Sequence, residues 1–290
     1  MNIVEQEKNR LQRAIFYCNE RFPPVAYTIL VGLFFWSAMI VFSLNPSSKE
    51  AWLGGIVMWL VFFHLRIFDE HKDYHQDRWS HPDRYLSRGI VTLAFLGRLG
   101  LGAIILEAVL SLMIGWKAFL FWLGTLCFSF LMRLEFGIGQ WLEKRMLLYA
   151  ITHNPIVACL ALFAWSCTGE AWQPRNFWYV LTISIASFGF EIARKTNLPE
   201  EEIEGVDSYT SVYGLEKVLW ILRGSIVLSI VTSSVVLFFL SSSVWGWAIL
   251  GLASIASLFL TLPSGNSKKF EGVGLLFLLL AMLSIIVAPW

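Results

Sequence analysis

Charge is what this sequence has least of. Only 15% of its 290 residues are charged and 57% are hydrophobic, with a mean hydropathy of +0.63. A soluble domain of this size carries about 25% charged residues. The apolar content excludes a disordered chain, and the net charge of +1 provides no attraction to nucleic acid. The composition therefore predicts a polytopic membrane protein, with lipid and not nucleic acid around it.

Cysteine is scarce as well. The four cysteines form no CxxC pair, which argues against a disulfide-framed secreted module and is typical of small buried side chains. We do not expect residues 1–24 to be a signal peptide, because they mix charges of both signs and contain no short apolar core. We expect residues 1–24 to form an amphipathic segment on the cytoplasmic membrane surface, ended by Pro23 and Pro24.

Long apolar runs make up most of the remainder. A membrane-spanning helix needs about 20 mostly apolar residues, and no ten-residue alternation typical of a membrane β-barrel is present. The sequence therefore predicts an all-α fold in one transmembrane domain covering residues 1–290. Windows of spanning length predict nine transmembrane helices, at 25–44, 51–68, 89–113, 117–134, 147–167, 176–195, 217–240, 244–262 and 270–289.

The basic residues orient these helices. Of the 22 Lys and Arg residues, only Lys49, Lys117 and Arg175 lie in or beside the odd-numbered connections. Positive residues concentrate on the cytoplasmic side of membrane proteins. The N-terminus and the even-numbered connections are therefore predicted to be cytoplasmic, and the C-terminus to lie on the opposite face.

Two of these cytoplasmic connections hold an unusual share of the charge. Residues 66–88 contain ten charged residues and residues 191–207 contain eight. Within the first, Asp69, Asp73 and Asp77 are spaced four residues apart, which places their carboxylates on one face of a helix, about 6 Å from one another. We predict that this acidic ladder is the functional centre of the protein.

The chemistry of the ladder favours a metal and a phosphate group. Three carboxylates on one stripe repel each other unless a cation lies among them, and Mg²⁺ binds through one or two carboxylates together with substrate phosphates. The structural alternative is a solvated helix end laced with local salt bridges. Phosphate oxygens are suitable partners for the basic residues nearby, which are Lys72, Arg78, Arg84 and Arg88.

The ladder resembles the first aspartate-rich motif of the UbiA superfamily of intramembrane prenyltransferases, Asn-Asp-x-x-Asp-x-x-x-Asp-Arg followed by Arg-Pro-Asp-Arg. Asp69 stands at the leading Asn and Glu70 at the next Asp, and both changes preserve oxygen ligands. Asp73, Asp77 and Arg78 stand at the later motif positions. The resemblance extends to the placement of acidic loops after the second and sixth helices.

This resemblance implies nine helices around a central cavity that holds a prenyl diphosphate through Mg²⁺ bound to both acidic motifs. The resemblance also implies that Asp69, Asp73, Asp77 and Glu191 are the catalytic residues.

The second motif is less faithful to the family pattern. Glu191 can serve as its leading acid and as a metal ligand, and Lys195 as a diphosphate ligand. Glu204 and Asp207 are further candidate metal ligands. Pro199 breaks the helix between them, so these acids need not share a face.

The fifth predicted helix carries additional candidates. Lys144 and Arg145 precede it, and the resemblance implies a diphosphate contact for a basic residue here and a pocket contact for Tyr149. His153 and Asn154 are predicted pocket residues, with polar packing between helices as the alternative. Basic flanking of a membrane helix would equally explain Lys144 and Arg145.

Glu107 is the one acid deep within the third predicted helix. An ionisable residue inside a membrane helix is a functional candidate by default. It can remain protonated or face a cavity.

Together these features predict a Mg²⁺-dependent enzyme that ionises a polyprenyl diphosphate and transfers the prenyl group to a hydrophobic, aromatic acceptor. The first alternative is a UbiA-type terpene cyclase, in which the substrate's own chain captures the cation and no acceptor is needed. A remote alternative is a divalent-cation transporter, which the helix-end position of the acids disfavours. The sequence does not indicate an oligomeric state.

Overall fold

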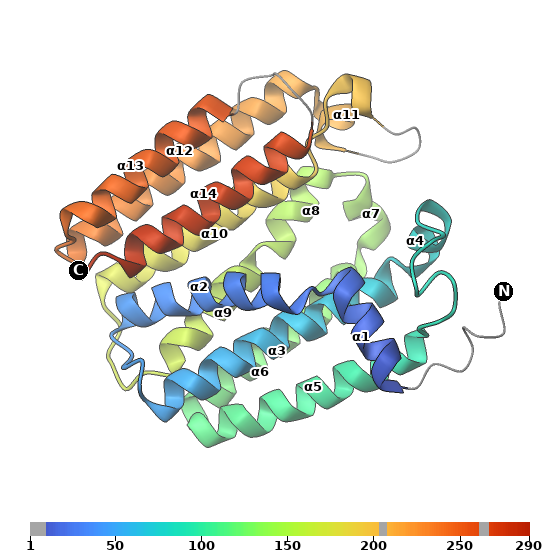
Figure 1. The fold of residues 1–290 in the computed structure, drawn as a ribbon, viewed down its shortest axis with the longest axis horizontal. Helices are drawn as coiled ribbons and strands as arrows, with labels where there is room; N and C mark the ends of the chain where they lie inside the picture. Colours follow the sequence, from blue (N-terminus) through green and yellow to red (C-terminus); the bar gives the residue numbers. More distant parts are fainter. Residues whose placement is uncertain (1–9, 203–207, 261–266) are drawn as a thin grey trace. The chain divides into compact units, whose positions relative to one another are not determined.

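The computed structural model describes residues 10–202, 208–260 and 267–290, and within them the regular structure is helical (Figure 1). The α-helices are α1 (Arg10–Arg21), α2 (Pro24–Phe42), α3 (Lys49–Lys72), α4 (Tyr74–Ser80), α5 (Leu93–Ile114), α6 (Trp116–Arg133), α7 (Gly139–Glu143), α8 (Met146–His153), α9 (Pro155–Ser166), α10 (Pro174–Arg194), α11 (Tyr209–Tyr213), α12 (Leu215–Phe239), α13 (Val244–Leu260) and α14 (Lys268–Ile286). Two short 3₁₀ turns, Glu135–Gly137 and Pro199–Glu201, complete the regular elements of the described part.

Seven helical segments of the described chain are long and apolar enough to cross a membrane. They correspond to seven of the nine predicted windows, and the protein is an integral membrane protein. The segments are Pro24–Phe42, Lys49–Lys72, Leu93–Ile114, Met146–Ser166, Pro174–Arg194, Leu215–Phe239 and Lys268–Ile286.

The other two windows also fold as helices, α6 and α13. Lys117 is the second residue of α6 and Arg133 is its last, so α6 is less apolar than the seven segments. The α13 helix has 17 residues and is shorter than the seven. The last two residues of the eighth window, 261 and 262, lie outside the described part. A count of nine spans therefore stays a prediction.

Local sequence explains where several helices begin and break. The third window was predicted from residue 89, but α5 begins at Leu93 because the side chain of Thr92 accepts a hydrogen bond from the backbone N–H of Phe95 at 3.2 Å. Gly89 precedes it in the left-handed conformation at φ 75°, which favours glycine. Pro155 divides the fifth window into α8 and α9, because proline lacks the N–H that would continue the helix.

The chain divides into two compact units. Unit 1 contains residues 1–32 and 47–134, and in it α3 packs against α5, which packs against α6. Tyr17 of α1 is buried with Ile67, Leu86, Val91 and Leu96 in one apolar cluster.

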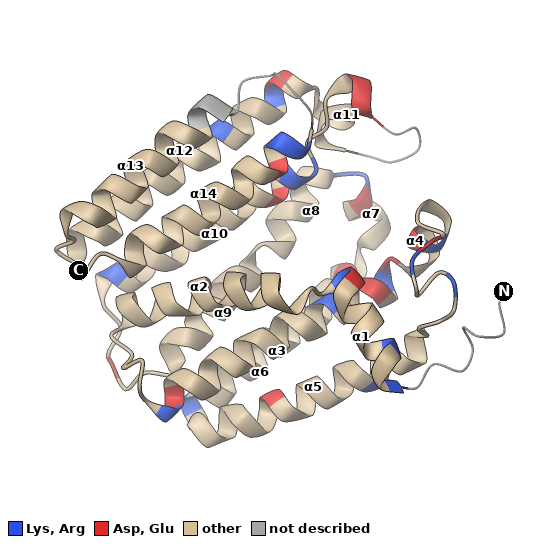
Figure 2. Cartoon of the chain, in the orientation of Figure 1, with Lys and Arg blue, Asp and Glu red and all other residues tan. Residues whose placement is uncertain are grey.

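Unit 2 contains residues 33–46 and 135–290. Here α10 packs against α9, α12 and α14, and α14 also packs against α13 (Figure 1). Glycines allow the close approach, since a Cβ added at Gly274 would lie 2.7 Å from the Cβ of Ala193. In each unit the charged residues gather at helix ends, while the helix bodies are almost free of charge (Figure 2).

Candidate active site

The acidic ladder of unit 1 lies at a corner between two helices. Asp73 ends α3 and begins α4, with φ −88° and ψ 2°. The four-residue hydrogen-bond pattern of the backbone continues across this corner. The N–H of Asp73 donates to the backbone carbonyl of Asp69, and the N–H of Asp77 donates to that of Asp73, each at 2.8 Å. The predicted spacing is therefore kept in the backbone although the helix is broken.

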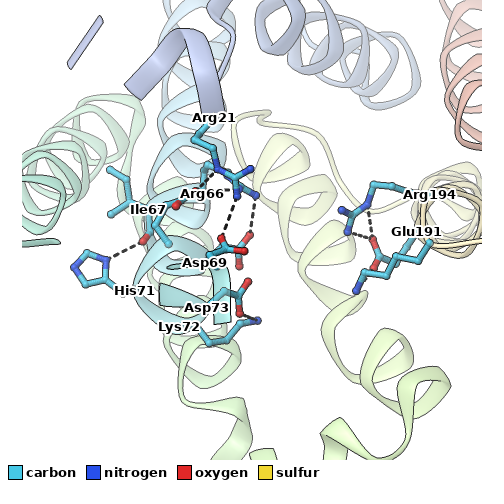
Figure 3. Close-up of polar contacts among 12 residues, drawn as sticks. Arg21, Arg66, Ile67, Asp69, His71, Lys72, Asp73, Glu191 and Arg194 are labelled. Atoms are coloured by element: carbon cyan, nitrogen blue, oxygen red, sulfur yellow. Dashed lines mark hydrogen bonds and ion pairs between the residues drawn. The ribbon is translucent and has the colours of Figure 1, made fainter. Parts of the chain in front are cut away.

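Two of the three ladder carboxylates are accessible. The side chains of Asp69 and Asp73 are 49% and 45% exposed. Figure 3 shows them on the same side of α3, one following the other. Their ion pairs are loose, with Arg66 3.7 Å from Asp69 and Lys72 Nζ 3.8 Å from Asp73. These two carboxylates can exchange their partners for a cation at little cost.

The third ladder carboxylate is held by arginines. Asp77 Oδ2 lies 2.5 Å from an Arg84 guanidinium nitrogen and 3.6 Å from Arg21, and its side chain is only 19% exposed. In the structure, therefore, Asp69 and Asp73 are accessible, whereas Asp77 is held by two arginines. Arg84, a predicted diphosphate ligand, forms an ion pair with Asp77 in the structure.

Glu70 is the most buried acid of the motif, with its side chain 1% exposed. Its Oε1 accepts hydrogen bonds from Arg21 Nε at 2.7 Å and from Arg66 at 2.9 Å. Sequence reasoning assigned no role to Arg21 or Arg66. The spacing of Arg66 four residues before Glu70 is a readable signal for a helical ion pair, whereas no signal links Arg21 to a residue 49 positions away.

The remaining predicted phosphate ligands of this unit differ in setting. Arg78 and Arg88 are exposed, and Lys72 is largely covered with 17% of its side chain exposed. Figure 3 shows Lys72 extending toward Asp73, as the ion pair between them requires. All three lie on the chain segment that carries the accessible aspartates.

Glu191 of unit 2 is neutralised by its own helix. Its Oε2 lies 2.6 Å from Arg194 (Figure 3). Its Oε1 lies 3.0 Å from Lys195. The side chain is 29% exposed, and both cations are more exposed than the acid. Glu204 and Asp207 lie outside the described residues.

Short-range contacts surround this second acidic region. The N–H of Tyr209 donates to the carbonyl of Lys195 at 3.1 Å, which ties α11 to the end of α10. Burial raises the pKa of the Tyr209 hydroxyl, and the charge of Glu191 raises it further. Tyr213 accepts a hydrogen bond from the N–H of Leu147 at 3.2 Å, so α11 also contacts the start of α8.

The predicted pocket residues of α8 form an aromatic stack. The rings of Tyr149 and His153 lie 3.9 Å apart and nearly parallel, and Lys195 Nζ lies 5.9 Å from the Tyr149 ring centroid. Asn154 is a packing residue in this structure, because its side-chain amide donates to the carbonyl of Ser184 at 3.0 Å. That contact holds the break between α8 and α9 against α10.

The two basic residues before α8 are both exposed. Arg145 lies over the ring of Trp141, 4.2 Å from its centroid, and also donates to the Trp141 carbonyl at 3.0 Å. Lys144 ends α7. This setting agrees with interfacial flanking residues and leaves the Lys144 ammonium accessible.

Glu107 lies in a closed polar cluster of unit 1. It is fully buried, with Oε1 2.8 Å from His64 Nδ1, while Trp122 Nε1 donates to Oε2 at 2.9 Å. His64 Nε2 lies 3.3 Å from the Ser129 hydroxyl. These bonds satisfy the carboxyl group and join α3, α5 and α6, so the structure gives Glu107 a packing role.

The side chains of the protein supply only some of the oxygen ligands that a Mg²⁺ ion needs. Within the described residues no three His, Cys, Asp or Glu side chains converge closely enough to hold an ion. Mg²⁺ needs just one or two carboxylates when phosphate oxygens supply other ligands. Asp69 and Asp73 in unit 1, and Glu191 in unit 2, provide such carboxylates.

Comparison with known proteins identifies a family for this chain. The UbiA prenyltransferase family model matches residues 25–271. None of the curated proteins matches the sequence significantly.

Three solved structures share the fold. A digeranylgeranylglyceryl phosphate synthase superimposes with a TM-score of 0.69 at 18% identity, over 96% of this chain and 99% of its own. A UbiA homologue from Aeropyrum pernix K1 gives 0.69 at 14% identity, covering 90% and 95%. A UbiA homologue from Archaeoglobus fulgidus bound to DMAPP and Mg²⁺ gives 0.59 at 14% identity, covering 91% and 96%. Because the family match extends over most of the sequence, the chain belongs to the UbiA prenyltransferase family.

Proposed function

We propose that this protein is a Mg²⁺-dependent intramembrane prenyltransferase that ionises a polyprenyl diphosphate and transfers the prenyl group to a hydrophobic, aromatic acceptor. The observation that carries the proposal is the accessible pair Asp69 and Asp73, which lies at the end of a membrane-spanning helix beside Lys72. Membership of the UbiA family supports the reaction class.

In this proposal the accessible aspartates hold the metal and the nearby cations hold phosphate oxygens. Bound Mg²⁺ would neutralise the charge that grows on the leaving diphosphate as the carbon–oxygen bond breaks. Lys72, Arg78 and Arg88 bind diphosphate oxygens directly. Arg84 contributes when its ion pair with Asp77 loosens.

Glu191 has a matching role in unit 2. Arg194 and Lys195 neutralise its carboxylate in the structure. A diphosphate attracts the same two cations, and this competition would release Glu191 to bind a metal. Lys195 then contacts phosphate, and Tyr149, whose ring it faces, contributes an aromatic surface for the prenyl chain.

The related structures point the same way. The homologue from Archaeoglobus fulgidus binds DMAPP, a prenyl diphosphate, together with Mg²⁺. The digeranylgeranylglyceryl phosphate synthase is a further member of the same fold. We extend prenyl diphosphate binding to this chain because it carries carboxylates and cations of the type that such a ligand requires.

We also propose that the N-terminus and both acidic regions are cytoplasmic and that the C-terminus lies on the opposite face. The distribution of Lys and Arg supports this orientation. Cysteines introduced at Asp83 and at Trp290 should react with a membrane-impermeant thiol reagent from opposite sides of sealed vesicles. Labelling of both from one side would contradict the orientation.

Turnover of prenyl diphosphates tests the function. Purified protein in lipid nanodiscs is incubated with geranyl, farnesyl or geranylgeranyl diphosphate, with Mg²⁺ or with a chelator, and with or without an aromatic acceptor. We expect Mg²⁺-dependent release of pyrophosphate and a prenylated acceptor. The matched controls are Asp73→Asn, which should be inactive, and the exposed Asp83→Asn, which should be active.

The same experiment separates the alternatives. A cyclic hydrocarbon formed without acceptor would replace the transferase with a cyclase. Metal flux into liposomes that Asp73→Asn abolishes, without turnover of any diphosphate, would replace the enzyme with a transporter.

A further inference from the structure

Helix α1 packs against unit 1 beside the acidic motif through its C-terminal half. Tyr17 is 1% exposed within the apolar cluster. The ring of Phe16 stacks on Tyr85 with centroids 5.1 Å apart, and the Glu20 carboxylate accepts a hydrogen bond from the Tyr85 N–H at 3.2 Å. Burial raises the pKa of the Tyr17 hydroxyl, and the charge of Glu70 raises it further. These contacts hold α1 in place without using its last residue, Arg21.

Arg21 reaches from α1 to both helices of the acidic corner. Its Nε donates to Glu70 on α3 at 2.7 Å, and its terminal nitrogen lies 3.6 Å from Asp77 on α4. Asp73 lies at the junction of those two helices. The guanidinium therefore connects one residue on each side of the corner that carries the accessible aspartates.

The connection is part of an alternating chain of charges. Arg66 pairs with Glu70, Glu70 with Arg21, Arg21 with Asp77, and Asp77 with Arg84. Burial opposes the charge on Arg21, but the hydrogen bond and charge of Glu70, followed by the charge of Asp77, outweigh it and raise the Arg21 pKa. Arg21 is thus a permanent cation at the centre of this row of ion pairs.

We propose that Arg21 is a positioning residue for the metal–diphosphate site: by binding Glu70 and Asp77 together, it fixes the α3–α4 corner and keeps Asp69 and Asp73 open for the ion. This inference rests on the proposed function and adds to it a residue from outside both acidic regions. Figure 3 shows Arg21 extending from α1 toward the acidic end of α3.

The shape of the side chain matters as much as its charge. A guanidinium presents donors in a planar fork and can bind two carboxylates at once, whereas a lysine ammonium acts as a point charge on a flexible stem. Arg21→Lys should therefore restore only part of the function that Arg21→Met removes. Groups hydrogen-bonded to a metal ligand typically change the metal affinity by about 10- to 100-fold when removed. Arg21 acts on Asp69 and Asp73 through the α3–α4 corner, so its effect should lie at the lower end of that range.

The test compares four variants of the full-length protein in nanodiscs. Arg21→Met and Arg21→Lys alter the connection. Arg10→Met makes the same change on the exposed start of the same helix. Phe16→Ala weakens the docking of α1 and leaves every charge in place. The readouts are a Mn²⁺ titration followed by electron paramagnetic resonance in the presence of inorganic pyrophosphate, and the Mg²⁺ dependence of turnover.

We expect Arg21→Met to weaken Mn²⁺ binding by about 10-fold or more, and Arg21→Lys by a smaller factor. The Mg²⁺ concentration for half-maximal turnover should rise by a similar factor. Arg10→Met should bind as the wild type does, and Phe16→Ala should lose thermal stability while its Mn²⁺ affinity stays within about 2-fold of the wild type.

Equal Mn²⁺ affinity in Arg21→Met and Phe16→Ala would overturn the inference, because Arg21 would then serve only to attach α1. If Arg21→Met does not fold, Arg21→Lys decides alone, and an unchanged titration would again count against the inference. A wild type that turns over no prenyl diphosphate but shows the Arg21 effect on Mn²⁺ would instead overturn the proposed function and leave the positioning role standing.

Discussion

The two acidic regions of this protein are built in different ways. In the first, the carboxylates of Glu70 and Asp77 are paired with arginines from other segments, including Arg21 on α1 and Arg84 in the loop after α4. In the second, Glu191 pairs with residues three and four positions later on its own helix. The first region thus combines local pairs on α3 with pairs that only the tertiary fold brings together, whereas the pairs of Glu191 follow from the periodicity of one helix.

This difference bears on how each region responds to a ligand. Removing a partner from a buried ion pair leaves an uncompensated charge away from water, which is strongly unfavourable. Pairs between neighbouring residues near the surface contribute little and are easily exchanged. The first region therefore provides a fixed frame around the accessible Asp69 and Asp73, while the Glu191 pairs can be released when a diphosphate competes for their cations.

The largest effect is expected at the accessible pair. Asp73→Asn should reduce turnover of a prenyl diphosphate by about 100- to 1,000-fold, because it removes a charged group that holds the ion stabilising the leaving diphosphate. Pyrophosphate release measures the change, with Asp83→Asn as the matched control. A variant that keeps a third of the wild-type rate would contradict the assignment of Asp73 as a metal ligand.

The buried ion pairs of Glu70 with Arg21 and Arg66 should contribute more to stability than the accessible aspartates do. Glu70→Gln should reduce the free energy of unfolding by about 3 kcal/mol, since Arg21 and Arg66 would both lose the buried carboxylate to which they are hydrogen-bonded. Asp69→Asn, which alters a half-exposed carboxylate whose ion pair with Arg66 spans 3.7 Å, should change it by less than about 1 kcal/mol. Unfolding in mixed micelles by titration with a denaturing detergent compares the two. Equal losses would remove the distinction between frame and accessible pair.

A smaller effect is expected in the second region. Glu191→Gln should lower kcat by about 10-fold, equivalent to 1.4 kcal/mol. The KM for the diphosphate should stay level or fall, because Arg194 and Lys195 would no longer be neutralised by the acid. The exposed Glu200→Gln should match the wild type in both constants. A rise in KM without loss of kcat would indicate that Glu191 contributes to binding alone.

The smallest effect concerns the acid inside the membrane. Glu107→Gln should keep turnover within about 2-fold and stability within about 1 kcal/mol. The amide oxygen of the glutamine can still accept the hydrogen bond from Trp122, and its NH₂ group can donate to His64. Glu107→Leu should destabilise the protein more, since the polar groups of His64 and Trp122 would lose their partner. A 100-fold loss of activity in the glutamine variant would restore a catalytic role.

Much of the fold was predictable because lipid imposes simple requirements. Seven of the predicted windows correspond to helical segments of spanning length, since a long and nearly uncharged apolar segment is what can cross a bilayer. The breaks were harder to place. The start of α5 depended on the cap formed by Thr92, and three consecutive left-handed residues, Glu135 to Gly137, follow the end of α6.

The site was predictable to the extent that its residues are close in sequence. The four-residue spacing of Asp69, Asp73 and Asp77 is present in the backbone hydrogen bonds as expected. The division of the three into an accessible pair and a neutralised third was not predictable, because Arg21 and Arg84 reach Asp77 only in the folded chain.

The sequence by itself determined that the protein lies in the membrane, that its helices carry charge mainly at their ends, and that its acids have the spacing of the UbiA family. These properties follow from composition and from periods of a few residues, which the chain carries locally. Only the tertiary structure decided which acids are accessible and which are held by arginines from distant segments, and it placed the N-terminal helix beside the acidic motif. The physical reason is that ion pairing and burial depend on distances between residues far apart in sequence, and folding alone sets those distances.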